Sequence, residues 1–276
     1  MSDRYAVIGN PVAHSKSPFI HAAFARQTDQ DVVYERILAP LDGFAQAVET
    51  FRAEGGLGLN VTLPFKLQAY QIAHERGVRA RDAQAVNTLK FEGATIYGDN
   101  TDGIGLVRDI QVNLNFPIEG RDVLVMGAGG AAQGALSVLL DAKPARLVIA
   151  NRTVEKAERL AERWRGTRGL SPALLSASGY AELSGREFDV VVNSTSASLN
   201  DTVPELPDGV FARGCLAYDM MYGKGVTAFL ERALSQGAAL VADGIGMLVE
   251  QAAESFFIWR GVRPQTGPVI TALKAQ

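Results

Sequence analysis

Short apolar runs alternate with longer segments of helical pattern along most of the chain. In the first hundred residues, the runs that predict strands lie at residues 5–8, 32–34, 57–63, 86–91 and 95–98. A helix is predicted to begin at Ser17, because Ser is a favoured N-cap and Pro18 suits the first helical position. A second helix is predicted over 43–52. Strands and helices in alternation are typical of an α/β protein with parallel sheets.

The alternation becomes more regular after residue 122. Apolar runs predict strands at residues 122–126, 146–150, 190–192, 216–218 and 239–241, and the intervening segments predict helices at 130–140, 154–165 and 226–235. Asp243 is expected to cap a long helix toward Trp259, and a short helix is expected over 269–273. The change in pattern near residue 102 predicts a domain boundary. We therefore expect a first domain over 1–102, a second over 103–242 and a final helical segment over 243–276.

The composition narrows the class of protein. The chain has 276 residues, of which 47% are hydrophobic and 21% charged, so it can build two cores of ordinary size. A net charge of −3 and scattered Lys and Arg residues argue against a nucleic-acid partner. No signal-peptide apolar region and no apolar run of roughly 20 residues occurs, so we expect a cytoplasmic protein without a membrane partner. The sequence is compatible with a monomer or a homodimer.

The cysteines and histidines argue against a metal centre. Cys215 is the single cysteine, which excludes an intrachain disulfide and a thiolate cluster. The three histidines, His14, His21 and His74, lack the spacing of a metal-binding motif. We therefore predict a site without metal.

A glycine-rich turn follows the predicted strand at 122–126 and precedes a predicted helix. Gly127, Gly129 and Ala132 occupy the three small positions of a G-x-G-x-x-G/A motif. The first permits a tight turn, the second lets backbone N–H groups approach a pyrophosphate, and the third permits close helix packing. The alternative is a turn without a ligand, but the flanking strand and helix favour a dinucleotide site. The residues assigned to this site are Gly127, Ala128, Gly129, Gly130 and Ala131.

The end of the next predicted strand indicates which dinucleotide is bound. An NAD site is expected to have Asp or Glu about 20 residues beyond the glycines, where it accepts a hydrogen bond from the ribose. Here Asn151, Arg152 and Thr153 stand at that place. A guanidinium can hold phosphate oxygens, and Thr153 is expected to cap the following helix. This pattern favours NADP, with Lys156 as a further phosphate contact or simply a solvated surface residue.

Polar residues at two places in the first domain suggest substrate chemistry. Ser15 and Ser17 place two hydroxyls at a predicted helix start, which suits a small carboxylate, although Ser17 could equally be only an N-cap. Asn60 and Thr62 share one face of a predicted strand, and Lys66 follows it. Each of these residues also has an ordinary structural interpretation. From the residues alone, the chain is an NADP-binding protein whose first domain has no assigned role.

Eight segments together resemble the signature blocks of the shikimate dehydrogenase family. They lie at residues 9–18, 60–66, 85–88, 98–103, 127–131, 151–153, 218–222 and 242–249, in the order found in that family. The resemblance implies two α/β domains that flank a cleft, the second a Rossmann-like NADP-binding domain, with the final helices returning to the first. It implies the NADPH-dependent, reversible reduction of 3-dehydroshikimate to shikimate, a step toward the aromatic amino acids.

The resemblance also assigns roles to single residues. Lys66 and Asp102 are implied to be the catalytic pair, and Ser15 and Ser17 to hold the substrate carboxylate. The other implied substrate ligands are Asn60, Thr62, Asn87, Asp102, Tyr222 and Gln251. Met220 and Gly244 are implied to lie near the nicotinamide. Lys156 departs from the family, which often has Arg there, and this weakens bidentate recognition of a phosphate.

Three alternatives remain open at this point. A quinate/shikimate dehydrogenase often has an acidic residue where Thr153 stands and accepts NAD, so this sequence leans away from it. A non-catalytic NADP-sensing regulator on the same fold is disfavoured because both Lys66 and Asp102 are retained. A methylenetetrahydrofolate dehydrogenase shares the architecture and a catalytic lysine, but its bulky substrate does not call for a carboxylate site at Ser15 and Ser17.

Overall fold

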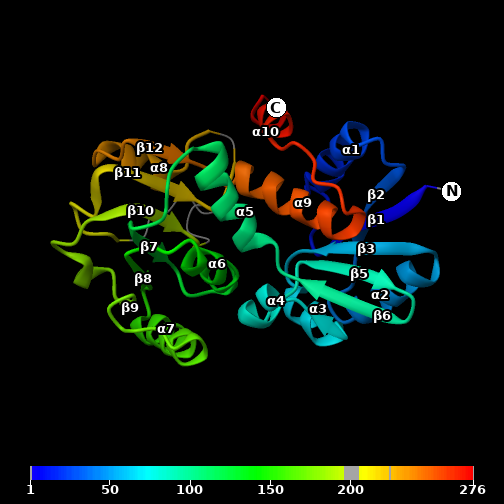
Figure 1. Cartoon of the computed structure of the whole chain (residues 1–276), viewed down its shortest axis with the longest axis horizontal. Coiled ribbons are helices and arrows are strands. Elements are labelled where there is room, and N and C mark those ends of the chain that lie inside the picture. The colour runs from blue at the N-terminus through cyan, green and yellow to red at the C-terminus, as the bar shows by residue number, and fades with distance from the viewer. Residues whose placement is uncertain (1, 196–204, 224, 276) are drawn as a thin grey trace. The chain divides into compact units, whose positions relative to one another are not determined.

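The computed structural model describes residues 2–195, 205–223 and 225–275. The chain divides into two compact units, one of Met1–Gly105 with Leu248–Gln276 and one of Leu106–Met247 (Figure 1). The α/β class predicted from the sequence is confirmed. The predicted boundaries fall at residues 102 and 242, whereas the units change within helices α5 (Asp102–Arg108) and α9 (Ile245–Arg260).

The first unit contains a six-stranded mixed sheet. Its strand order is β2-β1-β3-β5-β6-β4. The strands are β1 (Asp3–Gly9), β2 (Val32–Leu38), β3 (Gly56–Val61), β4 (Glu75–Arg76), β5 (Thr88–Glu92) and β6 (Thr95–Asp99). The first three strands are parallel, and β5 runs antiparallel to both β3 and β6. The strands predicted at 86–91 and 95–98 therefore correspond to a β-hairpin.

The first unit also contains helices, several of which pack apolar faces against this sheet. They are α1 (Ser17–Gln27), α2 (Phe44–Ala53), α3 (Lys66–Ile72), α4 (Val78–Ala83), the greater part of α9, and α10 (Gly267–Lys274). A core of aliphatic and aromatic side chains, among them Phe44, Val48 and Phe65, packs between β1, β3, β5 and the helices α2 and α3. The hydrophobic pattern does not predict α3 and α4, because both are short and only about half of their residues are apolar.

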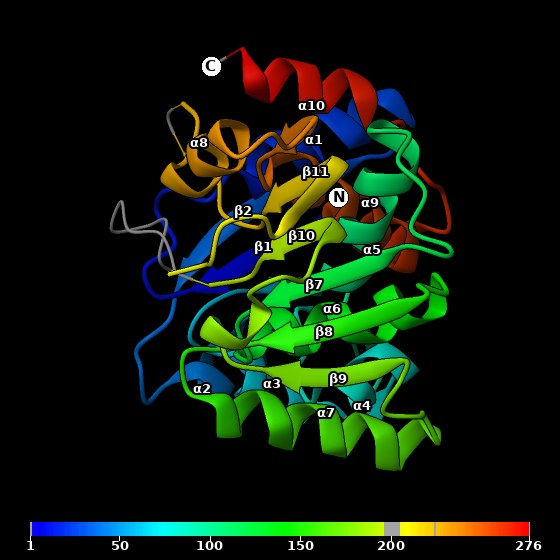
Figure 2. The same ribbon diagram turned by 90° about the vertical axis from the view of Figure 1, so that its left-hand side faces the viewer.

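The second unit is a fully parallel sheet with helices. Its strand order is β12-β11-β10-β7-β8-β9, and Figure 2 shows these strands running in one direction. The strands are β7 (Asp122–Met126), β8 (Arg146–Ala150), β9 (Leu175–Ser178), β10 (Phe188–Asn193), β11 (Phe211–Asp219) and β12 (Leu240–Ala242). The helices are α6 (Gly130–Asp141), α7 (Val154–Arg168), α8 (Ala228–Ser235) and a π-helical turn at Asp109–Asn113. Because the central strands are buried on both faces, their sequences are continuous apolar runs.

Candidate active site

Lys66 and Asp102 form an ion pair in the first unit. Lys66 is the first residue of α3 and Asp102 the first residue of α5, and Lys66 Nζ donates to Asp102 Oδ2 over 2.6 Å. The Lys66 side chain is 30% exposed and that of Asp102 14%. The ammonium is therefore held in one place by the carboxylate while remaining accessible to a small molecule.

Asn87 fixes the other oxygen of the Asp102 carboxylate. Its Nδ2 donates to Asp102 Oδ1 over 2.8 Å and lies 3.0 Å from Thr101 Oγ1 and 3.4 Å from Gln251 Oε1. Asn87 is buried just before β5, and Gln251 lies on α9. The structure thus brings together four of the residues assigned from the sequence, Lys66, Asn87, Asp102 and Gln251, from four separate parts of the chain.

Asn60 lies behind this group, within a buried polar network. Its Oδ1 accepts a hydrogen bond from the Tyr34 hydroxyl over 2.7 Å, and its Nδ2 donates to Ser255 Oγ over 2.9 Å. Nδ2 also lies 3.3 Å from the Asn87 carbonyl oxygen. Asn60 is only 6% exposed. In this structure the Asn60 amide is turned away from solvent and contacts the backbone of Asn87, just before β5.

His21 belongs to the same network and remains neutral. Its ring stacks on Tyr34 with centroids 4.2 Å apart, and its Nε2 lies 3.1 Å from Asn60 Oδ1. Complete burial lowers the pKa of His21 to about 3. Burial likewise raises the pKa of the Tyr34 hydroxyl well above its usual range. Both groups therefore act as uncharged hydrogen-bonding partners at physiological pH.

The sequence carries weak signals for this network. Ser255 lies four residues after Gln251 on α9, so the spacing alone places the two on one helix face. Tyr34 sits in a strand whose partner could not be known before the sheet order was available. Nothing in the spacing of His21 indicates its place in this network.

Ser15 and Ser17 lie close together at the start of α1. Ser15 Oγ is 3.1 Å from Ser17 Oγ and accepts a hydrogen bond from the Ser17 N–H over 3.3 Å. The N-cap position belongs to Lys16, and Ser17 is the first helical residue, so the prediction that Ser17 is the N-cap is wrong. The reason is that the Lys16 backbone already has helical angles, and the hydroxyl that reaches the first turn comes from Ser15.

Thr62 and Tyr222 are also assigned to the substrate by the resemblance. Thr62 follows β3 directly, partly exposed, and its backbone N–H donates to the Ile8 carbonyl oxygen over 3.0 Å. Tyr222 belongs to the second unit and is 37% exposed. Met220 and Gly244 belong to that unit as well.

The glycine-rich loop between β7 and α6 has the geometry of a phosphate cradle. Gly127 has a φ of +101°, and a Cβ there would lie 2.8 Å from Ser194 Oγ, so a side chain is excluded. Gly129 is the N-cap residue of α6 and, as a glycine, has no side chain that could cover the helix start. A Cβ at Gly129 or Gly130 would meet nothing within 4 Å, so the space beside both residues is open. Ala132 is fully buried, as the third small position of the motif requires. The loop thus leaves room above the helix start for a pyrophosphate.

The end of β8 lies beside this loop. Strands β7 and β8 are paired, and the Gly127 N–H donates to the Ala150 carbonyl oxygen over 2.7 Å. Asn151 Nδ2 donates to the Thr153 carbonyl oxygen over 2.8 Å, which orders the turn. Arg152, Thr153 and Lys156 are exposed. No carboxylate occupies this turn, so its charge suits the phosphate that distinguishes NADP from NAD.

Thr153 caps the following helix only through its backbone. It is the N-cap residue of α7 with an extended backbone, but its side chain makes no cap hydrogen bond. The predicted hydroxyl cap is therefore wrong. The hydroxyl instead remains at the exposed turn, beside Arg152.

Met220 and Gly244 lie against each other at the same edge of the sheet. The Met220 N–H donates to the Asn193 carbonyl oxygen over 2.9 Å, just beyond the ends of β10 and β11. A Cβ on Gly244 would lie 2.3 Å from the Met220 carbonyl oxygen. Only glycine permits this close approach of two backbone segments. In this unit the carboxyl ends of the strands thus carry all the residues assigned to the cofactor.

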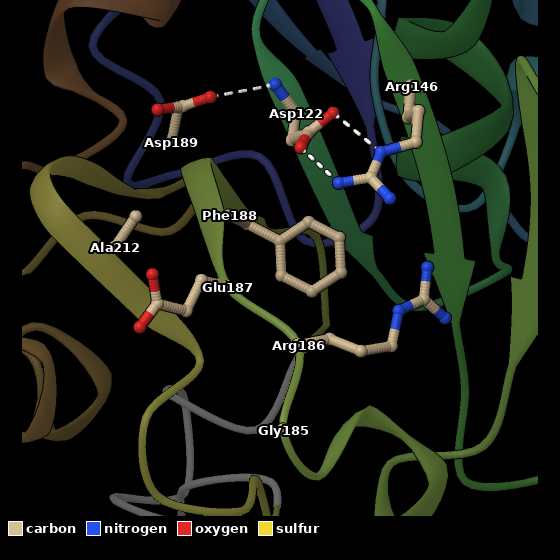
Figure 3. A pocket seen from close by; sticks show the side chains of 8 residues that line it. All are labelled: Asp122, Arg146, Gly185, Arg186, Glu187, Phe188, Asp189 and Ala212. Atoms are coloured by element: carbon tan, nitrogen blue, oxygen red, sulfur yellow. Dashed lines mark hydrogen bonds and ion pairs between the residues drawn. The ribbon is translucent and has the colours of Figure 1, made fainter.

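A groove of about 470 Å³ lies at the opposite edge of this sheet (Figure 3). It is lined by residues at the amino ends of β7, β8 and β10, where Asp122 accepts a hydrogen bond from Arg146 Nε over 2.8 Å. That hydrogen bond, more than the partial burial that opposes it, lowers the pKa of Asp122. Ligands of open parallel sheets bind at the carboxyl ends of the strands. This groove is therefore not the cofactor site.

Within residues 2–195, 205–223 and 225–275, no group of three or more His, Cys, Asp or Glu side chains is arranged to hold a metal ion. None of the helices in the described part of the chain has the length and apolar character needed to cross a membrane.

Comparisons with known proteins identify the family of this chain. Three family models match: the shikimate dehydrogenase substrate binding domain over residues 7–89, shikimate / quinate 5-dehydrogenase over 111–202, and the shikimate 5'-dehydrogenase C-terminal domain over 244–274. A shikimate dehydrogenase (NADP(+)) of Nitrosospira multiformis is 61% identical over 275 residues, which cover 100% of this chain and 98% of the relative.

Solved structures are similar over the same length. An Ael1 enzyme from Pseudomonas putida is 52% identical, with a TM-score of 0.92 and coverage of 99% of this chain and 98% of that one. Shikimate 5-dehydrogenase from Thermus thermophilus in complex with NADP(H) and shikimate is 29% identical, with a TM-score of 0.86 and 99% coverage of both chains. The chain therefore belongs to the shikimate dehydrogenase family.

Proposed function

We propose that this protein is an NADP-dependent oxidoreductase that catalyses the reversible reduction of 3-dehydroshikimate to shikimate. The observation that carries the proposal is the 2.6 Å pair of Lys66 and Asp102, which Asn87 and Gln251 extend into one hydrogen-bonded group. A relative that is 61% identical over the whole chain bears the name of this enzyme. The proposed pathway role is the supply of precursors of the aromatic amino acids.

The substrate is proposed to bind mainly to the first unit. Ser15 and Ser17 hold its carboxylate with their hydroxyls, which lie 3.1 Å apart. Its ring hydroxyls contact side chains that combine donors and acceptors, namely Thr62, Asn87, Asp102, Gln251 and, from the second unit, Tyr222. Asn60 acts from behind, through its contact with the Asn87 carbonyl.

Lys66 is proposed as the group that exchanges a proton with the substrate oxygen. NADPH, when bound, supplies the hydride that converts the ketone to an alcohol. The carbonyl oxygen then gains negative charge, and the Lys66 ammonium donates a proton to it. In the oxidising direction the neutral amine accepts that proton. Asp102 is proposed to keep Lys66 Nζ in position during both oxidation and reduction. Its Oδ2 accepts from Nζ, and its Oδ1 is fixed by Asn87.

NADP is proposed to bind along the carboxyl edge of the second sheet. Gly127, Ala128, Gly129, Gly130 and Ala131 would receive the pyrophosphate, and Asn151, Arg152, Thr153 and Lys156 the phosphate of the ribose. Met220 and Gly244 would lie near the nicotinamide. These roles agree with the open loop at α6 and with the exposed cations at the end of β8.

Replacing Arg152 with alanine is expected to raise the KM for NADP and to leave weak activity with NAD almost unchanged. A hydrogen bond to a charged group contributes about 1.5–3 kcal/mol, which corresponds to roughly tenfold to over a hundredfold in KM. Steady-state kinetics with both cofactors measure the effect. Equal losses with NADP and NAD would contradict the phosphate contact.

Alanine at Ser15 or Ser17 is expected to raise the KM for shikimate while the KM for NADP stays near wild type. Each loses one hydroxyl contact to the proposed carboxylate. Any loss of stability at Ser17 should not include a cap contribution, because Lys16 and not Ser17 is the N-cap residue of α1. If both variants kept the wild-type KM for shikimate, the carboxylate would have to bind elsewhere.

One assay distinguishes the proposal from its rivals. Initial rates are measured with shikimate and quinate, each with NADP and with NAD. Oxidation of shikimate with NADP, at a kcat/KM well above the other three combinations, is the expected result. Comparable rates with quinate or NAD would indicate a quinate/shikimate dehydrogenase, and NADPH binding without turnover would indicate a regulator.

The partners, localisation and oligomeric state of the protein are also proposed from the sequence. A net charge of −3 without a basic cluster gives no reason to expect a nucleic-acid partner. We propose a cytoplasmic protein that is a monomer or a homodimer, which light scattering after gel filtration would test.

A further inference from the structure

Arg36 lies beside the two serines at the start of α1. It belongs to β2, the edge strand of the first sheet, and helix α1 lies next to this strand (Figure 1). Tyr34 and Arg36 are two residues apart on one strand, so their side chains share a face. Tyr34 stacks on His21 of α1, which identifies this face as the one that α1 covers. Arg36 is therefore directed toward the α1 side of the sheet.

The Arg36 guanidinium is bonded to the backbone of Ser15. Its Nε and Nη2 donate to the Ser15 carbonyl oxygen over 3.2 Å and 2.7 Å. A carbonyl oxygen is neutral, so these contacts fix the guanidinium without cancelling its charge. In the part of the chain that the structure describes, no carboxylate lies within ion-pair distance of Arg36.

The charge also acts on the neighbouring hydroxyls. Burial raises the pKa of Tyr34, while a hydrogen bond with Ser17 and the positive charge of Arg36 oppose that rise. Arg36 thus exerts its field on a hydroxyl that is itself in contact with Ser17. The region around Ser15 Oγ and Ser17 Oγ therefore has a positive potential. The hydroxyls are neutral donors, and the charge comes from the Arg36 guanidinium.

A carboxylate at this place needs such a cation. Ser17 is only 6% exposed, so an anion bound at its hydroxyl loses part of its hydration. Two serine hydroxyls supply hydrogen bonds but no charge, whereas a nearby guanidinium stabilises the anion by Coulomb attraction. Lys16, between the serines, is a second cation near this place, and like Arg36 it is exposed. Arg36 is distinguished by two hydrogen bonds that hold its guanidinium at the Ser15 backbone.

We propose that Arg36 is a specificity-determining residue, which makes the Ser15–Ser17 site select an anionic carboxylate over its neutral derivatives. The proposal rests on the proposed function, since it concerns how the shikimate carboxylate is recognised. Arg36 acts here through its charge and by fixing the Ser15 backbone, and it takes no part in the hydride or proton transfer.

The test compares an acid with its neutral ester. Wild type and Arg36→Gln are assayed with shikimate and with methyl shikimate at saturating NADP. For Arg36→Gln, the KM for shikimate is expected to rise about tenfold, which corresponds to ~1.4 kcal/mol, with kcat within about twofold of wild type. The KM for the methyl ester should stay near wild type. Arg36→Lys should restore most of the preference for the acid, because it keeps the charge.

Two further variants serve as controls. Arg52 on α2 also donates to a backbone carbonyl, that of Gly93, over 2.6 Å, but at the far end of the β5–β6 hairpin. Arg52→Gln should change neither KM. Lys16→Gln tests the neighbouring cation and should leave the ratio of acid to ester close to wild type.

Three outcomes would overturn the proposal. If Arg36→Gln weakens acid and ester alike, Arg36 has only a structural role at Ser15. If Lys16→Gln lowers the ratio and Arg36→Gln does not, the selecting charge belongs to Lys16. In both cases wild-type turnover of shikimate leaves the proposed function intact, whereas a wild type that oxidises neither compound removes both.

Discussion

Replacing Lys66 with alanine is expected to lower kcat for shikimate oxidation by about 10²–10⁴-fold, the usual contribution of a general acid–base group. The KM for shikimate should move much less, because the lost interaction belongs mainly to the transition state. The geometry supports this expectation, since Lys66 Nζ is held at 2.6 Å from Asp102 Oδ2 and still remains 30% exposed. The measurement is kcat at saturating shikimate and NADP.

Asp102→Asn should also lower kcat, because an amide cannot hold Nζ with the same charge. Lys66→Ala combined with Asp102→Asn should be less impaired than the product of the two single losses, since residues that act as a unit are not additive. Lys90→Ala is the matched control: Lys90 pairs with Glu92 at the surface of the same sheet and should keep wild-type kcat. A loss below about threefold for Lys66→Ala would make Lys66 a binding or structural residue.

The second unit could be read from the sequence because its signals are local. The turn at Gly127 and the helix at α6 adjoin their strand, and the missing acid at Asn151 follows the next one along the chain. Each conclusion needed only residues close together in the sequence and the rule that the carboxyl ends of parallel strands lie at the same edge of the sheet. Every strand and helix predicted for this unit corresponds to an element of the structure, whereas β9, the π-helical turn and a short 3-10 turn at Ala181–Leu183 were not predicted.

The first unit was harder to read because its site is assembled over long distances. Asn87, which is bonded to Asp102, meets Gln251 only after the chain has passed through the second unit and returned in α9. Spacing could not identify Lys66 as special, since an exposed lysine is common, and only the resemblance to a known family did so. The network of His21, Tyr34 and Ser255 was missed for the same reason.

A second long-range group joins α9 to the strand that leads into the site. Arg79 on α4 donates from Nη2 to Asp99 Oδ2 over 2.7 Å and from Nη1 to Glu254 Oε1 over 2.9 Å. The side chains of Asp99 and Glu254 are only 5% and 7% exposed. Arg263 makes a further ion pair with Glu254. Asp99 stands at the end of β6, close to Asp102, and Glu254 lies between Gln251 and Ser255 on α9.

Arg79→Ala is expected to lower the free energy of unfolding of the first unit by about 3 kcal/mol. Removal of one partner of a buried ion pair typically costs about 3–5 kcal/mol, because it leaves an uncompensated charge. The lower figure applies here, since Arg263 continues to neutralise Glu254 while Asp99 loses both of its guanidinium contacts. The stability of Arg79→Lys should lie between that of wild type and that of Arg79→Ala. A lysine keeps the positive charge but cannot donate to both oxygens of the Asp99 carboxylate.

The two tryptophans allow the first unit to be observed separately. Trp259 lies on α9 in the first unit and Trp164 on α7 in the second, and the chain has no others. In a Trp164→Phe background, urea unfolding followed by fluorescence reports the surroundings of Trp259. Arg52→Ala is the control, because its partner Glu49 is 56% exposed, and it should cost less than about 1 kcal/mol.

The loss from Arg79→Ala should depend on pH in a defined direction. Burial raises the pKa of Glu254, but hydrogen bonds and charges from Arg263 and Arg79 outweigh it and hold that pKa below its usual value of 4.5. A carboxyl whose pKa is lowered by folding stabilises the native state above its unfolded pKa, and this contribution disappears as pH falls through the folded pKa. The difference between wild type and Arg79→Ala should therefore be full at pH 7 and shrink below about pH 4. A loss of less than about 1 kcal/mol at pH 7, equal to that of Arg52→Ala, would show that the cluster behaves as a solvated surface network and does not hold α9 to the site.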